Sequence, residues 1–182
     1  PVSGARDVIT LSSGVNTVIG GAGKDEISAG AGTNTILGDD GKATFFDNGD
    51  LKLIESTNLG SGDVDTIMLS DGTNTVIAGA GNDIINIGGG TNVVLGDEGK
   101  REVLTDANGV ATGTTTIASL NDSNGGDDTI NVGPGINIVV GGAGTDTIIV
   151  SDSTIGSRAT VLGDSGSMTL ANGGTLLSIE SS

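Results

Sequence analysis

The sequence predicts an all-β fold, a parallel β-solenoid with no helices of note. Two observations lead to this prediction: a nonapeptide repeat fills most of the chain, and the composition lacks the bulky residues of a conventional core. The chain has 182 residues, of which 34 are glycine and only two are phenylalanine, and it has no Trp, Tyr, Cys or His. Ile, Val, Leu and Phe together form roughly a quarter of the residues, which is more than disordered chains contain. A thin, repetitive sheet structure can bury these residues without aromatic volume.

The charge and composition exclude several classes of function. Seven basic residues stand against 23 acidic ones, which gives a formal net charge of -16. Nucleic-acid binding requires a basic surface, so we expect no nucleic-acid partner. Without Cys or His there is no thiol or imidazole chemistry, and no nucleophile–base pair or phosphate loop is visible, so we do not expect an enzyme. No apolar run is long enough to predict a membrane span, and no signal-peptide pattern opens the sequence.

The nonapeptides occupy residues 5–40, 63–98 and 126–152, and one more follows a four-residue insertion at 157–165. Their third position is Asp or Asn in eleven of the twelve blocks, Ala159 being the exception. The fifth position is always β-branched, as Ile9, Val18, Ile27, Ile36, Ile67, Val76, Ile85, Val94, Ile130, Val139, Ile148 and Val161. Each block therefore indicates a short strand followed by a glycine-rich turn. Two blocks form one 18-residue coil, and coils stack at about 4.8 Å over a column of Ile and Val.

Three spacers interrupt the nonapeptides at 41–62, 99–125 and 166–182, and each places an Asn-Gly turn between two strand-like runs. A spacer of this kind forms either a wider coil or a hairpin at the side of the solenoid, and we favour the coil because it keeps the solenoid continuous. The chain then reads as a single array of about nine coils, residues 1–182, in three superrepeats. These are residues 5–62, 63–125 and 126–182, the last completed by residues equivalent to 1–4.

Three segments resemble the calcium-binding repeats of the repeats-in-toxin (RTX) family, whose motif is GGxGxDxUx with U a large aliphatic residue. They are GGAGKDEIS at 20–28, AGAGNDIIN at 78–86 and GGAGTDTII at 141–149. The resemblance covers the nonapeptides and implies a parallel β-roll that folds around calcium. It also implies a secreted bacterial protein, so we expect an extracellular or cell-surface location.

The positions of Asp and Asn indicate two different edges of the roll. Successive nonapeptides lie on opposite edges, so residues 18 apart share an edge, and Asp and Asn alternate between blocks. One edge should therefore be acidic and suited to calcium, which takes six to eight oxygen ligands. The other edge, with Asn16, Asn34, Asn74, Asn92 and Asn137, is expected to form a structural ladder of amide hydrogen bonds.

In the turns that lead into the spacers, the aspartate stands at the second position of the motif and not at the sixth. This gives Asp39, Asp97 and Asp164 in GDDGKA, GDEGKR and GDSGSM. We predict up to two calcium ions per superrepeat, with Asp63 and Asp127 as additional candidates. The predicted ligand groups are Asp7/Asp25/Asp39, Asp65/Asp83/Asp97 and Asp128/Asp146/Asp164. Six ions would change the formal charge from -16 to -4, and without cations the chain should be largely unfolded because the stacked carboxylates repel.

Three functions remain open at this point. The first is a calcium-stabilised structural module of a secreted bacterial protein, such as a fibre, an adhesin stalk, a surface layer or a matrix protein. The second is the secretion or folding domain of an RTX toxin or hydrolase. The third is ice binding through Thr33, Thr73 and Thr91, a rank of threonines that Val15 and Ile136 interrupt.

The two ends of the sequence predict how such modules associate. When SIESS at 178–182 is joined to PVSGARD at 1–7, the product matches the internal segment LIESTNLGSGDVD at 53–65 with one residue fewer. The sequence therefore begins and ends at the same position within the superrepeat. Solenoid ends expose strand edges that pair with another chain. We expect identical repeats or subunits to stack head to tail.

Overall fold

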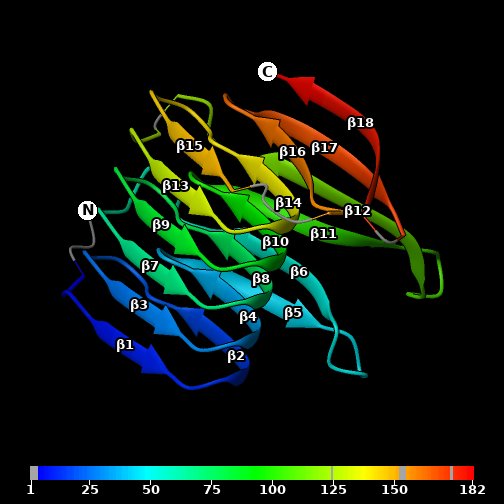
Figure 1. Ribbon diagram of the computed structural model, residues 1–182, viewed down its shortest axis with the longest axis horizontal. Coiled ribbons are helices and arrows are strands. Elements are labelled where there is room, and N and C mark those ends of the chain that lie inside the picture. The colour runs from blue at the N-terminus through cyan, green and yellow to red at the C-terminus, as the bar shows by residue number, and fades with distance from the viewer. Residues whose placement is uncertain (1–3, 124, 152–154, 173) are drawn as a thin grey trace.

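The computed structural model in Figure 1 shows an elongated stack of β-coils with hairpins along one side. It describes residues 4–123, 125–151, 155–172 and 174–182. These residues form three six-stranded β-sheets and contain no α-helix. The all-β prediction is confirmed. Residues 1–3, which would belong to the junction expected from the sequence ends, lie outside the described residues.

Two parallel sheets form the body of the roll. Sheet A contains β1 (Val8–Leu11), β3 (Glu26–Ala29), β7 (Thr66–Leu69), β9 (Ile84–Ile87), β13 (Thr129–Val132) and β15 (Thr147–Val150). Sheet B contains β2 (Gly14–Ile19), β4 (Gly32–Leu37), β8 (Gly72–Ile77), β10 (Gly90–Leu95), β14 (Gly135–Val140) and β16 (Arg158–Leu162). One strand of each sheet forms one coil, and the register places equivalent nonapeptide positions directly above one another, as Ile9, Ile27 and Ile67 show.

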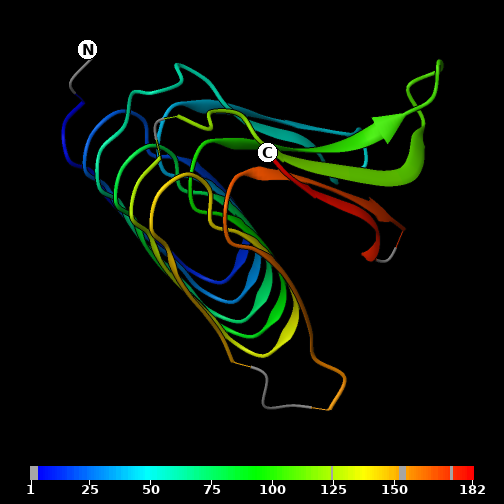
Figure 2. The same cartoon turned by 90° about the horizontal axis from the view of Figure 1, so that it is seen from above.

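The three spacers form antiparallel hairpins, so the expectation of wide coils is wrong. The hairpins are β5 (Gly41–Phe45) with β6 (Leu51–Ser56), β11 (Gly99–Thr105) with β12 (Ala111–Ser119), and β17 (Gly166–Ala171) with β18 (Thr175–Ser181). They join edge to edge into sheet C, and Figure 2 shows them leaving the coils on one side. The described chain therefore has six coils and not about nine. At two tips Gly49 and Gly109 adopt φ of 88° and 80°, a conformation that closes a hairpin and that glycine reaches easily.

Two apolar cores hold the three sheets together. The first lies between sheets A and B and consists of the predicted Ile and Val columns, with Ile27, Ile36 and Val76 fully buried. The second lies between the outer face of sheet B and sheet C, where Leu37, Ile77 and Leu95 meet Ile54 and Ile117. A wide coil would leave this outer face of sheet B in water. Burial of its leucines and isoleucines, at about 25 cal/mol per Å², favours the hairpins.

The predicted Asn ladder is confirmed. Each Asn side chain donates from Nδ2 to Oδ1 of the Asn in the next coil, at 2.8 Å, from Asn16 through Asn34, Asn74 and Asn92 to Asn137. Each Nδ2 also donates to the carbonyl four residues earlier, as Asn34 does to Gly30 at 3.1 Å. Both amide hydrogens are therefore used inside the roll, and the ladder fixes the register of sheet B.

Candidate calcium-binding edge

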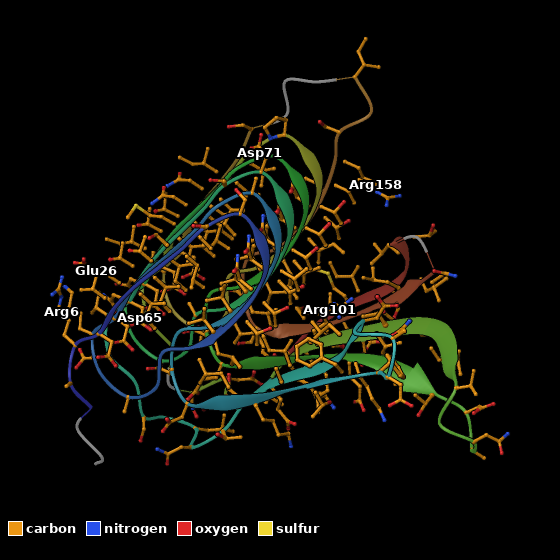
Figure 3. The ribbon with its side chains drawn as sticks, turned by 90° about the horizontal axis from the view of Figure 1, so that it is seen from below. Arg6, Glu26, Asp65, Asp71, Arg101 and Arg158 are labelled. Carbon is orange, nitrogen blue, oxygen red and sulfur yellow. The ribbon has the colours of Figure 1, made fainter. Side chains whose placement is uncertain are left out.

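Six aspartates form a continuous column at the edge where the turns enter sheet A. We call this the acidic edge; its column is Asp7, Asp25, Asp65, Asp83, Asp128 and Asp146. Each precedes a strand of sheet A, and all but Asp7 accept, through Oδ1, the backbone N–H of the aspartate in the preceding coil. The N–H groups of Asp7, Asp25, Asp65 and Asp83 donate at 2.7 Å, and that of Asp128 donates at 3.0 Å. Figure 3 shows Asp65 at this edge and Asp71 at the opposite edge.

The second oxygen of these carboxylates is buried without a hydrogen-bond partner. This holds for Oδ2 of Asp25, Asp65, Asp83, Asp128 and Asp146, and for Oδ1 of Asp39. Asp25 and Asp65 are 0 % exposed, and Asp83 and Asp128 are 1 % exposed. A buried anionic oxygen without a partner is costly. A repeated series of such oxygens is suited to binding shared cations.

Glycine residues lie close to these oxygens, where a side chain would overlap them. A Cβ placed on Gly38 would overlap both Asp65 Oδ2 and the carbonyl oxygen of Ala78, and one on Gly96 would overlap Asp128 Oδ2 and the carbonyl of Gly141. Carboxylate and carbonyl oxygens thus lie around one point that is kept clear of side chains. All the donors are hard oxygens, which suits calcium and does not suit softer transition metals.

Asp39 and Asp97 lie at the second position of their turns. In each case a hairpin is inserted within the turn, between this aspartate and the next aspartate of the column. The chain leaves the acidic edge after Asp39, forms the hairpin β5–β6, and returns at Gly62 to reach Asp65. The carboxylate of Asp39 accepts the N–H of Ala80 at 2.8 Å, in the turn of the following coil. Asp97 repeats this arrangement, accepting from Gly126 at 2.9 Å and Ala143 at 2.6 Å.

This division regroups the predicted ligands. The carboxylate charges that act on Asp39 come from Asp65 and Glu98, and Asp83 in turn feels the charge of Asp39. Asp97 lies with Asp128 and Asp146. Asp39 and Asp97 thus group with the aspartates of the following superrepeat, whereas the sequence placed them with those that precede them. The reason is that each spacer is inserted inside a turn, so residues on its two sides share that turn.

The remaining predicted residues are less buried. Asp7 and Asp164 are exposed and Asp146 is half-buried. Asp63 and Asp127 are also exposed. Asp63 accepts the N–H of Val64 at 3.2 Å, and Asp127 accepts the N–H of Thr145, in the next coil, at 2.8 Å. Among the described residues no three carboxylates converge on one point as a preformed cluster. A cation at this edge would therefore take its ligands from successive turns, with backbone carbonyls completing the oxygen set.

Burial makes the charged state of this edge unfavourable in the absence of a cation. Desolvation raises the pKa of Asp83 to about 9, with smaller contributions from the charges of Asp128 and Asp65. The same cause, with further carboxylate repulsion, raises the pKa of the other buried members: Asp39 and Asp128 to about 8, and Asp65 and Asp97 to about 7. The pKa values of Asp25 and Asp146 are raised mainly by burial as well. Neutralisation, by protons or by a divalent cation, therefore favours the folded roll.

Glu98 is an acidic residue of this edge that the sequence reasoning missed. It is 2 % exposed, and its carboxylate accepts from the N–H of Gly60 and from Asn121 Nδ2, the latter at 2.8 Å. It lies beside Asp97, and the equivalent residue of the first superrepeat, Asp40, likewise accepts from Asn58 at 3.1 Å. The signal in the sequence is the acidic residue directly after the second-position aspartate, paired with an Asn directly behind the hairpin.

Comparison with known proteins agrees with this geometry. The family model of the RTX calcium-binding nonapeptide repeat matches four copies, over residues 10–44, 59–99 and 122–152, which is more than half of the chain. Neither the curated proteins nor the solved structures contain a significant match. Among the described residues no helix is long and apolar enough to cross a membrane. The matched segments contain the glycine-rich turns and most of the buried aspartates, and the chain therefore belongs to the family of RTX calcium-binding nonapeptide repeats.

Proposed function

We propose that this chain is a calcium-stabilised structural module of a secreted bacterial protein, that it stacks end to end, and that it catalyses no reaction. One observation carries the proposal: a column of buried carboxylates in which five Oδ2 atoms and Asp39 Oδ1 have no partner. These carboxylates belong to successive coils, so any cation that they share links one coil to the next.

The physical consequence is that calcium would convert a flexible, poorly stacked chain into a rigid roll. Without cations, the buried negative charges oppose coil stacking. With calcium bound, the binding free energy becomes folding free energy, since the ligands come together only in the folded roll. The coils are then held by three means: the cation edge, the Asn ladder, and the two apolar cores. A module of this kind suits a fibre, stalk, surface layer or matrix that must be rigid in calcium-rich surroundings outside the cell.

The other two functions receive less support from the structure. Ice binding needs a wide, flat, regular face, and the rank of Thr33, Thr73 and Thr91 is continued by Val15 and Ile136. The neighbouring outward rank is buried under sheet C, where Thr35 and Thr75 are 4 % and 7 % exposed. A secretion or folding domain of a toxin or hydrolase would share the calcium edge, and it differs from the structural module in lacking end-to-end assembly.

Calcium titration of chelated protein tests the proposal. We expect far-ultraviolet circular dichroism to change from a coil-like to a β spectrum on adding calcium, with a small response to the same concentration of magnesium, which prefers a tighter octahedral shell. Scattering at saturating calcium should give a stiff rod. A chain that is fully β in calcium-free buffer at pH 8, and unaltered by calcium, would contradict the proposed function.

A further inference from the structure

Sheet C presents a rank of side chains to sheet B, and a single member of that rank is charged. The register of the hairpins aligns one residue of each strand across the sheet. In order, these residues are Ala43, Ile54, Arg101, Ile117, Met168 and Ile179. Ile54, Ile117 and Met168 belong to the second core. Arg101 therefore lies in an otherwise apolar rank, at a position where the other two hairpins have alanine and methionine.

The start of each hairpin determines which part of sheet B this rank faces. A Cβ on Gly99, the first residue of β11, would overlap the side chain of Leu95, the last residue of β10. The first glycines of the other two hairpins approach a leucine of sheet B in the same way. Two residues further along the same faces lie Arg101 in sheet C and Val93 in sheet B, and Thr75 is the neighbour of Val93. Figure 3 shows Arg101 between the coils and the hairpins.

The guanidinium group of Arg101 lacks partners in this position. Its Nε and Nη1 atoms are buried and have no hydrogen-bond partner, and none of the ion pairs among the described residues includes it. Burial lowers the pKa of Arg101, and no neighbouring carboxylate counteracts this effect. The group nevertheless stays charged, because a guanidinium is not deprotonated in proteins. A buried charge without a counter-ion is strongly destabilising. Water can satisfy its hydrogen bonds but not its charge.

The chemistry of this position favours a small carboxylate as the missing counter-ion. The N–H groups of a guanidinium form a planar fork that matches a carboxylate. The chain has a net charge of -16, which disfavours the approach of a polyanion. Arg101 is only partly buried as a whole, and Figure 2 shows the hairpins diverging from the coils toward their tips. A small ion can therefore approach the guanidinium from the side of the tips.

We propose that Arg101 binds a small carboxylate anion between sheets B and C, with the hydroxyl of Thr75 as a further donor. The anion accepts N–H groups of the guanidinium and neutralises its buried charge. Its binding stabilises the packing of β11 on sheet B and so the second core. This site uses no residue of the acidic edge, and the inference goes beyond the proposed function.

Side-chain NMR of the arginines, in full-length chain saturated with calcium, tests the inference directly. The chain has three arginines, so the Nε–H signal of Arg101 can be followed beside two internal controls. Titration with acetate at constant ionic strength should shift the Arg101 signal until it saturates. The controls are Arg6, which pairs with Glu26, and Arg158, which donates to the carbonyl of Gly174. Their signals should not follow this saturation curve.

Three variants separate the charge of Arg101 from its geometry. Arg101→Met introduces the residue that the third hairpin has at this position, so the chain should fold, and acetate should give it no specific rise in melting temperature. Arg101→Lys keeps the charge and loses the planar fork, so its affinity for acetate should fall about tenfold or more. Arg158→Met removes an exposed arginine and should respond to acetate as the wild type does. General salt effects are common to all these chains and cancel in the comparison.

Two results would overturn the inference: an Arg101 signal that does not saturate with acetate, or an Arg101→Met chain that acetate stabilises as much as the wild type. Sulfate is the tetrahedral comparison, and a tighter response of Arg101 to sulfate than to acetate would refute the carboxylate assignment. The Arg101→Met chain should bind calcium as the wild type does. Failure of the anion site would therefore leave the proposed function standing.

Discussion

Replacement of Asp83 by Asn should have opposite effects on the calcium-free fold and on calcium binding. Asp83 is 1 % exposed, its Oδ1 accepts the N–H of Asp65 at 2.7 Å, and its Oδ2 has no partner. A carboxamide has the same shape, can accept the same hydrogen bond and carries no charge. It therefore removes the buried charge while leaving the column geometry in place.

The size of the effect follows from the pKa of Asp83, which burial raises to about 9 from an ordinary value of 3.8. At pH 7 the carboxyl must be protonated in the calcium-free folded chain. That protonation costs about 4 kcal/mol relative to the unfolded chain, at ~1.36 kcal/mol per pH unit. Asp83→Asn should therefore stabilise the calcium-free chain by up to about 4 kcal/mol at pH 7, and by less than about 2 kcal/mol at pH 5.

Urea unfolding of calcium-free protein at the two pH values, followed by circular dichroism, measures this difference, and Asp47→Asn at an exposed hairpin tip is the matched control. Calorimetric titration should show fewer calcium ions bound by the Asp83→Asn chain, because the column loses a charged ligand. The reasoning would be refuted if this variant destabilised the calcium-free chain at pH 7, or if its gain did not shrink at pH 5.

Three further predictions concern the pH response, the two edges and the second core. The pKa values of Asp39 and Asp128, about 8 when folded, exceed their unfolded values. The calcium-free fold should therefore be most stable near pH 4, close to the ordinary aspartate pKa of 3.8, and lose stability as the pH rises to 8; a melting temperature that rises over this range would contradict it. Combined Asp25→Ala, Asp83→Ala and Asp146→Ala should remove most calcium binding in calorimetry, whereas Ala at Asn34, Asn92 and Asn137 should lower stability and keep the stoichiometry. Ile117→Ala, at a site 0 % exposed, should cost about 2–5 kcal/mol in urea unfolding with calcium present and leave the number of bound ions unaltered.

The features that depend on local periodicity could be predicted from the sequence. The Ile column of sheet A and the Asn ladder of sheet B follow from the 18-residue spacing, because each coil repeats the register of the one before. The form of the spacers could not be predicted in this way. An Asn-Gly turn between two apolar runs is compatible with a wide coil and with a hairpin. The choice depends on the second core, where Leu37 and Ile77 are covered by sheet C.

The spatial neighbours of Asp39 and Asp97 could not be read from sequence spacing for a related reason. Sequence spacing places Asp39 after Asp25, but the hairpin β5–β6 begins two residues later and returns the chain to the same turn at Gly62. Asp39 and Asp65 thus share one turn across 26 positions of sequence. Spacing alone cannot show this, since it depends on where a long insertion re-enters the coil. Glu98 was missed because its burial arises from the neck of the hairpin β11–β12 and not from the nonapeptide motif.

The insertion of hairpins inside calcium turns has a mechanical consequence for the whole molecule. Asp39 and Asp97 each lie just after the last residue of a sheet B strand, and the chain continues from each of them directly into a strand of sheet C. A cation at this edge therefore fixes the point from which each hairpin leaves, and so the packing of Ile54 and Ile117 on the leucines of sheet B. Conversely, hairpins that pair with one another hold the two halves of each divided turn together. We therefore expect calcium binding and assembly of the second core to be coupled, so that the metal-bound chain unfolds as one cooperative unit and not coil by coil.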